Sequence, residues 1–304
     1  MHFKIAEHIV EIKSVRTSID LISLLPSFAP FIIEEPAASE STVLSLTWDN
    51  TLPTIDSYRE IGDFDTGNGH TKVEKDDQTG AYQFTIRDIS EHEICILQSN
   101  KDFSVCSCKL MDDPRMHSYG LNSALMMSYA FATASRQTLL IHASCVKQGD
   151  YAYCFIAKSG TGKSTQVSNW LKHIPGCELL NDDNPIVRFI DGKAYCYGSP
   201  WSGKTPCYRN RKAYLGAITR IERAEANSVE KLRPVEAFAS FLPSCSTMKW
   251  ESKLYNDVMD AISKIIETTG IYTLHCLPDR ESAEICNAAI AIKEKISGTQ
   301  EVNS

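Results

Sequence analysis

The chain has 304 residues, of which 43% are hydrophobic and 23% charged; this is ordinary for a globular protein and allows one large or two modest domains. The net charge of −7 argues against a protein that holds nucleic acid on a basic surface. No apolar run is long enough to cross a bilayer, so no membrane contact is expected.

The first third of the sequence is rich in strand patterns. Alternating or β-branched residues occur over Phe3–Ile12, Thr42–Trp48, Ala81–Arg87 and Phe103–Leu110, and turn-rich stretches lie between them at Asp63–His70 and Glu74–Gly80. We therefore expect a small β-rich domain over residues 1–115, whose role the residues leave open, and a second domain over residues 116–304.

The eleven cysteines are scattered, mostly within apolar runs, and no secretory signal pattern precedes them. They are expected to be reduced, buried thiols of a cytoplasmic protein. Cys106 and Cys108 alternate along one strand, so both thiols should face the same side, and packing is favoured over metal binding.

After residue 115 the pattern of residues changes from strand-like to helical. Leu121–Ala134 predicts a buried helix, too short to span a membrane. Thr138–Lys147 and Tyr151–Ala157 then predict two strands, and the three residues between them permit a hairpin but exclude a parallel crossover. The sheet is therefore expected to be mixed and partly antiparallel.

The remaining elements follow in short succession. The patterns predict a helix over Lys163–His173, strands over Cys177–Leu180, Pro185–Ile190, Ala194–Tyr197 and Ala213–Ile221, and helices over Val235–Leu242 and Ser252–Thr268. A last strand over Ile271–Cys276 and a closing helix over Asp279–Ile296 follow, before a frayed tail at Thr299–Ser304.

The stretch Ala157–Thr165 has the pattern of a phosphate loop, because it follows a strand and opens a helix. Alanine stands where the motif has its first glycine. The expected nucleotide-binding residues are Ser159, Gly160, Thr161, Gly162, Lys163, Ser164 and Thr165. In such a loop the lysine reaches the terminal phosphates and the first hydroxyl, here Ser164, ligates Mg²⁺.

An acidic pair, Asp182 and Asp183, follows the next predicted strand. One carboxylate beside a phosphate loop can hold Mg²⁺ while the other accepts a proton from an attacking hydroxyl. The plain alternative is a turn, which Asn-Asp-Asp-Asn also favours. His142 lies in an apolar strand pattern; a hydrogen-bonded core histidine and a partner of an aspartate or phosphate are equally good interpretations.

The polar loop Gly198–Thr205 follows a predicted strand. Trp201, Lys204, Arg209 and Arg211 are candidate substrate or phosphate contacts, because the cations would neutralise a transferred phosphoryl group. A solvated surface loop is the alternative.

These residues resemble the HPr kinase/phosphorylase and phosphoenolpyruvate carboxykinase group, in particular its HPr-serine-kinase-like bacterial members of unassigned substrate. The resemblance rests on Leu140–Ser144, Ser159–Thr165, Leu180–Asn184 and Gly198–Lys204. It implies an α/β fold with a mixed, partly antiparallel sheet and a phosphate loop, preceded by the β-rich domain, and it implies ATP and Mg²⁺.

The resemblance also implies roles for the site residues. Asp182 would be the catalytic base, Asp183 and Ser164 metal ligands, and His142 a partner of the acidic pair; the roles of the two aspartates are open to reversal. The Glu-Val-Arg-Gly-type segment of authentic HPr kinases is absent, and the Trp201–Lys204 loop stands in its place, so HPr itself is not the expected acceptor.

The sequence thus predicts an ATP- and Mg²⁺-dependent kinase that transfers the γ-phosphoryl group to a hydroxyl of a small molecule or of a peptide or protein serine, with Asp182, Lys163 and His142 as catalytic residues. A carboxykinase-like enzyme and a non-catalytic nucleotide-binding regulator are the alternatives. No nucleic-acid partner is expected, and a homo-oligomeric state is left open.

Overall fold

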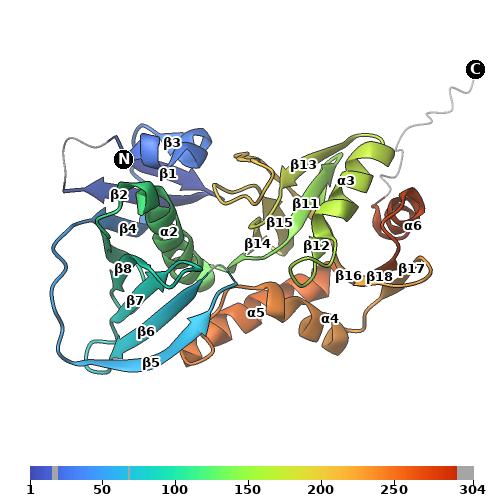
Figure 1. The fold of residues 1–304 in the computed structure, drawn as a ribbon. Coiled ribbons are helices and arrows are strands. Elements are labelled where there is room, and N and C mark those ends of the chain that lie inside the picture. Colours follow the sequence, from blue (N-terminus) through green and yellow to red (C-terminus); the bar gives the residue numbers. More distant parts are fainter. Residues whose placement is uncertain (16–19, 68, 293–304) are drawn as a thin grey trace, which may run out of the picture.

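The computed structural model describes residues 1–15, 20–67 and 69–292. The described strands form two mixed sheets, one from each half of the chain, and helices lie between and around them (Figure 1). The class is therefore mixed α/β, as expected. None of the described helices has the length and apolar character needed to cross a membrane.

The first sheet is built from the N-terminal strands in the order β3-β1-β2-β4-β9-β8-β7-β6-β5. β2 and β9 both run parallel to β4, and the remaining neighbours are antiparallel. Its strands are β1 (His2–Ile5), β2 (His8–Ser14), β3 (Ile32–Ile33), β4 (Thr42–Trp48), β5 (Tyr58–Asp65), β6 (His70–Asp76), β7 (Tyr82–Arg87), β8 (Glu93–Ser99) and β9 (Val105–Leu110). Short helical segments α1 (Leu21–Leu24), η1 (Pro26–Phe31) and η2 (Pro114–Met116) accompany it.

Sequence patterns located β4, β7 and β9 but did not separate β5, β6 and β8 from the turns around them. β5 explains why: it forms the sheet edge, and its mostly exposed residues include Arg59, Glu60 and Asp63. Such a strand lacks the apolar alternation on which strand prediction depends. The thiols of Cys106 and Cys108 are both buried on one side of β9, as predicted.

Helix α2 (His117–Ala134) is the predicted buried helix. It packs against β4, β8 and β9 of the first sheet and against β10 of the second. One hydrophobic cluster runs from the first sheet through α2 to the second sheet. The boundary near residue 115 stays a prediction, since the apolar core is continuous across it.

The second sheet has the order β10-β14-β15-β16-β12-β11-β13, and β18 pairs with β16 and with β17. The predicted hairpin is confirmed, because β11 and β12 pair antiparallel. β12 runs parallel to β16, so the sheet is mixed. Its strands are β10 (Thr138–Leu140), β11 (Ser144–Gln148), β12 (Tyr151–Ile156), β13 (Cys177–Asn181), β14 (Ile186–Ile190), β15 (Lys193–Tyr197), β16 (Lys212–Arg223), β17 (Ser228–Lys231) and β18 (Gly270–Cys276).

Two expected strands are each broken in two: residues 3–12 form the antiparallel pair β1 and β2, and the second break bears on the site. Residues 138–147 form β10 and β11, which pair with different strands. Between them, the backbone N–H groups of Ile141, His142 and Ala143 donate to the carbonyls of Pro185, Ser244 and Asp183. The prediction that His142 lies on a strand paired with β12 is therefore wrong; distant carbonyls hold it in the break.

Helices cover both faces of the second sheet. Helices α3 (Lys163–His173) and α6 (Arg280–Ile290) pack together on one face, in a smaller hydrophobic cluster. Helices α4 (Pro234–Phe241) and α5 (Ser252–Thr268) cover the other, with η3 (Leu242–Ser244) after α4. α3 has its predicted bounds. The predicted closing helix extends to Ile296, whereas α6 ends at Ile290 and Ala291 has extended backbone. Residues 293–296 and the predicted tail 299–304 lie outside the described residues.

Candidate functional site

The segment 157–162 connects the end of β12 to the start of α3. Gly160 and Gly162 have φ angles of 76° and 135°, which side chains other than glycine rarely adopt. A Cβ added to either glycine would meet no atom within 4 Å, so the segment borders open space. Residues Lys158–Thr161, together with Arg220–Arg223 at the end of β16, line a pocket of about 470 Å³.

Arg223 holds the same segment from the neighbouring strand. Its guanidinium donates to the carbonyl of Gly160 at 2.6 Å and to the carbonyl of Thr161 at 3.1 Å. These carbonyls are thereby turned toward β16, which is parallel to β12. Arg223 was not among the predicted site residues.

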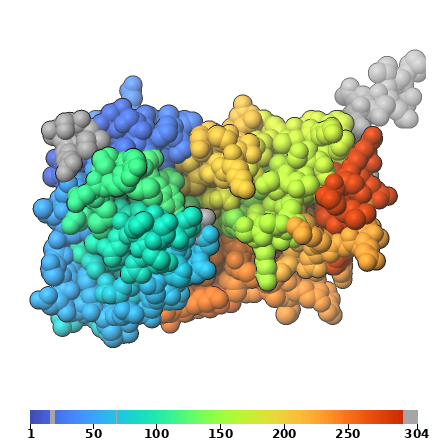
Figure 2. All heavy atoms as spheres, viewed as in Figure 1, coloured from blue at the N-terminus to red at the C-terminus, as the bar shows by residue number. Residues whose placement is uncertain are grey.

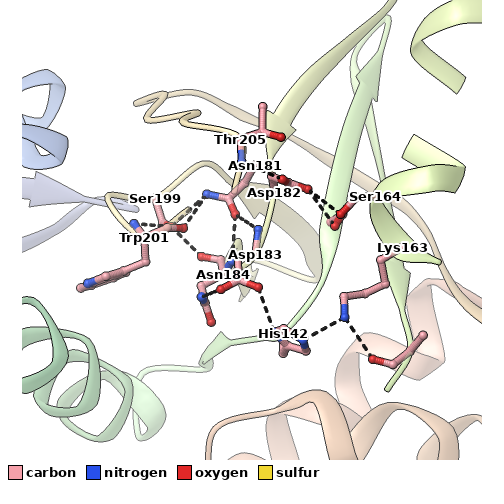
Figure 3. Close-up of polar contacts among 12 residues, drawn as sticks. His142, Lys163, Ser164, Asn181, Asp182, Asp183, Asn184, Ser199, Trp201 and Thr205 are labelled. Carbon is pink, nitrogen blue, oxygen red and sulfur yellow. Dashed lines mark hydrogen bonds and ion pairs between the residues drawn. The ribbon is translucent and has the colours of Figure 1, made fainter. Parts of the chain in front are cut away.

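Lys163, the first residue of α3, joins a chain of polar contacts with two residues from elsewhere in the fold. Its ammonium lies 2.8 Å from Nε2 of His142, and Nδ1 of His142 lies 3.1 Å from the Asp183 carboxylate (Figure 3). An ammonium only donates, so Nε2 accepts and Nδ1 carries the proton that faces Asp183. Of the two interpretations of His142, the structure therefore supports the aspartate partner.

The lysine is held in a partly dry environment. Burial lowers the pKa of Lys163 below its usual value, and the nearby carboxylates of Asp183 and Asp182 offset only part of this effect. Its ammonium also donates to the carbonyl of Ala157 at 3.2 Å.

Asp182 is buried, with 6% of its surface exposed. Its Oδ1 accepts from the hydroxyls of Ser144 at 3.1 Å and Ser164 at 3.5 Å, and Oδ2 accepts from the backbone N–H of Thr205 at 3.2 Å. Three donors from three different segments thus hold this carboxylate in place. Asp182 therefore lies beside Ser164, whereas Asp183 lies beside His142.

Asn181 fixes the orientation of both aspartates. Its side-chain oxygen accepts from the backbone N–H groups of Asp183 and Asn184, both at 2.9 Å, in an Asx turn. Its amide nitrogen donates to Ser199 Oγ and to the carbonyl of Trp201 (Figure 3). The predicted turn is thus present, and it aims the carboxylates toward the start of α3.

The other four candidates lie in different surroundings. The Trp201 ring is buried against Phe28 and Tyr129, so it packs in the core and only its backbone reaches the site. Arg209 and Arg211 both form ion pairs with Glu178 of β13, so both side chains are engaged away from the aspartates. In the part of the chain that the structure describes, Lys204 is exposed and no salt bridge reaches it.

Ser144, Gly203 and Thr205 also belong to this site and were not predicted as site residues. Gly203 lies so close to the pair that an added Cβ would be 2.8 Å from the Asp182 carbonyl oxygen. Sequence spacing gives no signal for these contacts. Those of Gly203 and Thr205 depend on how the 199–205 loop folds back over β13, and that of Ser144 depends on the pairing of β11 with β13.

Comparison with known proteins adds no family: no protein-family model matches the chain, and no curated protein matches it.

Proposed function

We propose that this chain is an ATP- and Mg²⁺-dependent kinase that transfers the γ-phosphoryl group to a hydroxyl of a small molecule or of a peptide or protein serine. The observation that carries the proposal is the meeting of Lys163 and Ser164, at the start of α3, with Asp182, Asp183 and His142 from two other segments. Lysine, a hydroxyl and two carboxylates at a helix N-terminus are the groups that phosphoryl transfer requires.

Nucleotide binding is supported by the 157–162 segment and α3. The first backbone N–H groups of a helix have no partners within it, and the helix dipole favours an anion at this end. Lys163 would leave His142 and bind the terminal phosphates. The pocket lined by Lys158–Thr161 and Arg220–Arg223 is the open space in which the nucleoside would lie.

The donor set beside Lys163 fits Mg²⁺, which prefers oxygen ligands. Ser164 Oγ and Asp182 Oδ1 are 3.5 Å apart, so these two groups would hold the ion, which neutralises phosphate charge when bound. This reverses the assignment implied by the resemblance, in which Asp183 is the metal ligand.

Asp183 is then the catalytic base. Its carboxylate would accept the acceptor's hydroxyl proton as the oxygen attacks the γ-phosphorus and the bond to the leaving ADP oxygen breaks. His142 orients this carboxylate through Nδ1. Departure of Lys163 toward the phosphates frees Nε2 of His142.

Lys163→Ala tests nucleotide binding. We expect a loss of MgATP affinity of at least roughly 10-fold by titration calorimetry, because the main cation facing the phosphates is removed. Lys172→Ala, an exposed lysine in the last turn of the same helix, is the matched control and should bind as the wild type does. Equal affinity in the wild type and Lys163→Ala would reject the site.

Exchange of each aspartate for asparagine separates the two roles. Asp183→Asn should keep MgATP affinity but lower ATP turnover against a library of hydroxyl compounds and serine peptides by ~100-fold or more. Asp182→Asn should weaken Mg²⁺ binding instead. The opposite pattern would restore Asp182 as the base, and tight binding without turnover of any acceptor would favour a nucleotide-binding regulator.

A further inference from the structure

Three thiols that are not among the groups of the site described above meet inside the second sheet. Cys145 of β11, Cys154 of β12 and Cys196 of β15 are fully buried. Their Sγ atoms are 3.3 Å (Cys145–Cys154), 3.5 Å (Cys145–Cys196) and 3.6 Å (Cys154–Cys196) apart. Among the described residues, this is the one group of three or more potential metal ligands whose ligand atoms all lie within 4.8 Å of one another.

The fold brings the three sulfur atoms together from distant sequence positions. Cys145 and Cys154 are direct partners across the β11–β12 hairpin. Cys196 lies on β15, which β16 separates from β12 in the sheet order, yet its sulfur atom is within 3.6 Å of both others. All three belong to the main hydrophobic cluster, on the face of the sheet that α3 does not cover.

The arrangement is suited to a soft cation. Sulfur atoms about 3.5 Å apart lie ~2.0 Å from the centre of their triangle, close to the ~2.3 Å of a metal–thiolate bond. Sulfur ligands select soft ions such as Cu(I) and Zn²⁺. A structural Zn²⁺ site needs four ligands, and the described residues supply three here.

Without a cation, the cluster has little to hold it together beyond apolar packing. Thiols are weak hydrogen-bond donors, so the contacts among the three sulfur atoms add little to that packing. A bound cation would displace thiol protons and join three strands that lead to the site: β11 begins after His142, β12 precedes the 157–162 segment and β15 precedes the 199–205 loop.

We propose that Cys145, Cys154 and Cys196 form a structural site for one Cu(I) ion, bound by three sulfur ligands. Because the thiols are enclosed, the ion enters during folding or a local opening of the sheet, and its release is slow. The site requires no nucleotide, so this proposal and the kinase proposal stand or fall separately.

The test measures copper in the purified full-length chain after Cu(I) loading under reducing conditions and in competition with a Cu(I) chelator. We expect one retained copper per wild-type chain and at least 10-fold weaker retention in Cys196→Ala. Cys286→Ala is the matched control: Cys286 is equally buried but belongs to the other hydrophobic cluster, so this variant should retain copper as the wild type does.

X-ray absorption at the copper edge of the loaded wild-type protein makes the test independent of how the variants fold. Three sulfur neighbours at ~2.2–2.3 Å would support the site. Nitrogen or oxygen ligands, two sulfur ligands only, equal copper retention by wild type and folded Cys196→Ala, or one tightly held zinc in place of copper would each overturn the proposal.

Discussion

Gly203 packs so closely against Asp182 and Asp183 that a side chain at this position would collide with them. A Cβ at this position would be 2.8 Å from the Asp182 carbonyl oxygen and 3.2 Å from Cβ of Asp183. Gly203→Ala should therefore displace the carboxylates and weaken Mg²⁺-dependent nucleotide binding by roughly 10-fold, while the free energy of unfolding falls by about 1–3 kcal/mol. Calorimetric titration and urea unfolding measure the two effects.

The control for this substitution is Gly192→Ala. Gly192 has φ of 77° in the β14–β15 turn, where an added Cβ meets nothing within 4 Å. Backbone strain should lower its stability as well, but nucleotide binding should stay unchanged. If Gly192→Ala loses binding as Gly203→Ala does, the effect is one of stability and not of carboxylate position.

His8 is a buried residue whose charge state couples stability to pH. Its Nε2 lies 2.9 Å from Thr138 Oγ1, and burial, with help from Arg188 and Arg136, lowers its pKa to about 3. The unfolded chain binds a proton at His8 below pH ~6.5, whereas the folded chain does so only near pH 3. The stability contributed by neutral His8 is thus fully present above pH ~6.5 and is lost progressively as the pH falls from ~6.5 to about 3.

Between pH 7 and 5, His8 should account for a loss of about 2 kcal/mol in the free energy of unfolding. His8→Gln, which cannot titrate, should show a correspondingly smaller decline in urea unfolding. His92→Gln is the comparison, because that ring is 79% exposed. A pH dependence identical in wild type and His8→Gln would show that His8 is not the group responsible.

At the scale of elements, the sequence predicted those features that contacts between neighbouring residues determine. The short turn of two residues between β11 and β12 sets their antiparallel pairing, and the glycine–lysine pattern marked the start of α3 at Lys163. The break at Ile141–Ala143 had no local signal, because its backbone partners are Asp183, Pro185 and Ser244. The apolar sequence through that break reads as a single strand, so His142 was placed on the wrong element.

In the candidate site, too, the residues marked by local sequence were predicted, and those placed by distant contacts were missed. The motif identified Lys163, Ser164 and the acidic pair, since each follows directly on a predictable strand or begins a helix. Arg223 lies more than sixty residues after Gly160, and only the parallel pairing of β16 with β12 brings it to the 157–162 segment. Trp201 was misread as a polar-loop contact, because nothing local indicates that Phe28 covers its ring.

Arg223 shows how one strand stabilises the connection at the end of its neighbour. Arg223→Ala removes two charge-assisted hydrogen bonds to the carbonyls of Gly160 and Thr161. The segment should become more mobile before ATP binds, and MgATP affinity should fall roughly 5- to 10-fold, or about 1 kcal/mol. Arg280→Ala, which removes a surface pair with Glu284, should change affinity by less than about twofold. Unchanged affinity in Arg223→Ala would mean that these bonds do not order the segment.

At the scale of the whole molecule, the two halves of the chain lie against each other (Figure 2), and side chains of one half contact the other. Phe28 of the N-terminal half packs edge-on against Trp201, whose carbonyl accepts from Asn181 beside the aspartates. On the opposite side, Glu251 accepts from Lys75 at 2.7 Å and from the Tyr82 hydroxyl at 2.5 Å. The N-terminal half therefore contacts the loop that carries Thr205 through Phe28, and the start of α5 through Lys75 and Tyr82.

This linkage predicts that a cavity in the N-terminal half destabilises the second sheet. Phe28 is fully buried, so Phe28→Ala should lower global stability by about 3–5 kcal/mol. Native-state hydrogen exchange should then show equal losses of protection in β7 and in β12, because both would exchange through the same global opening. Phe64→Ala, at a 36% exposed ring stacked on Trp250, should cost less than about half as much. Loss of protection confined to β7 would instead show that the two halves unfold separately and that the β-rich half does not support the site.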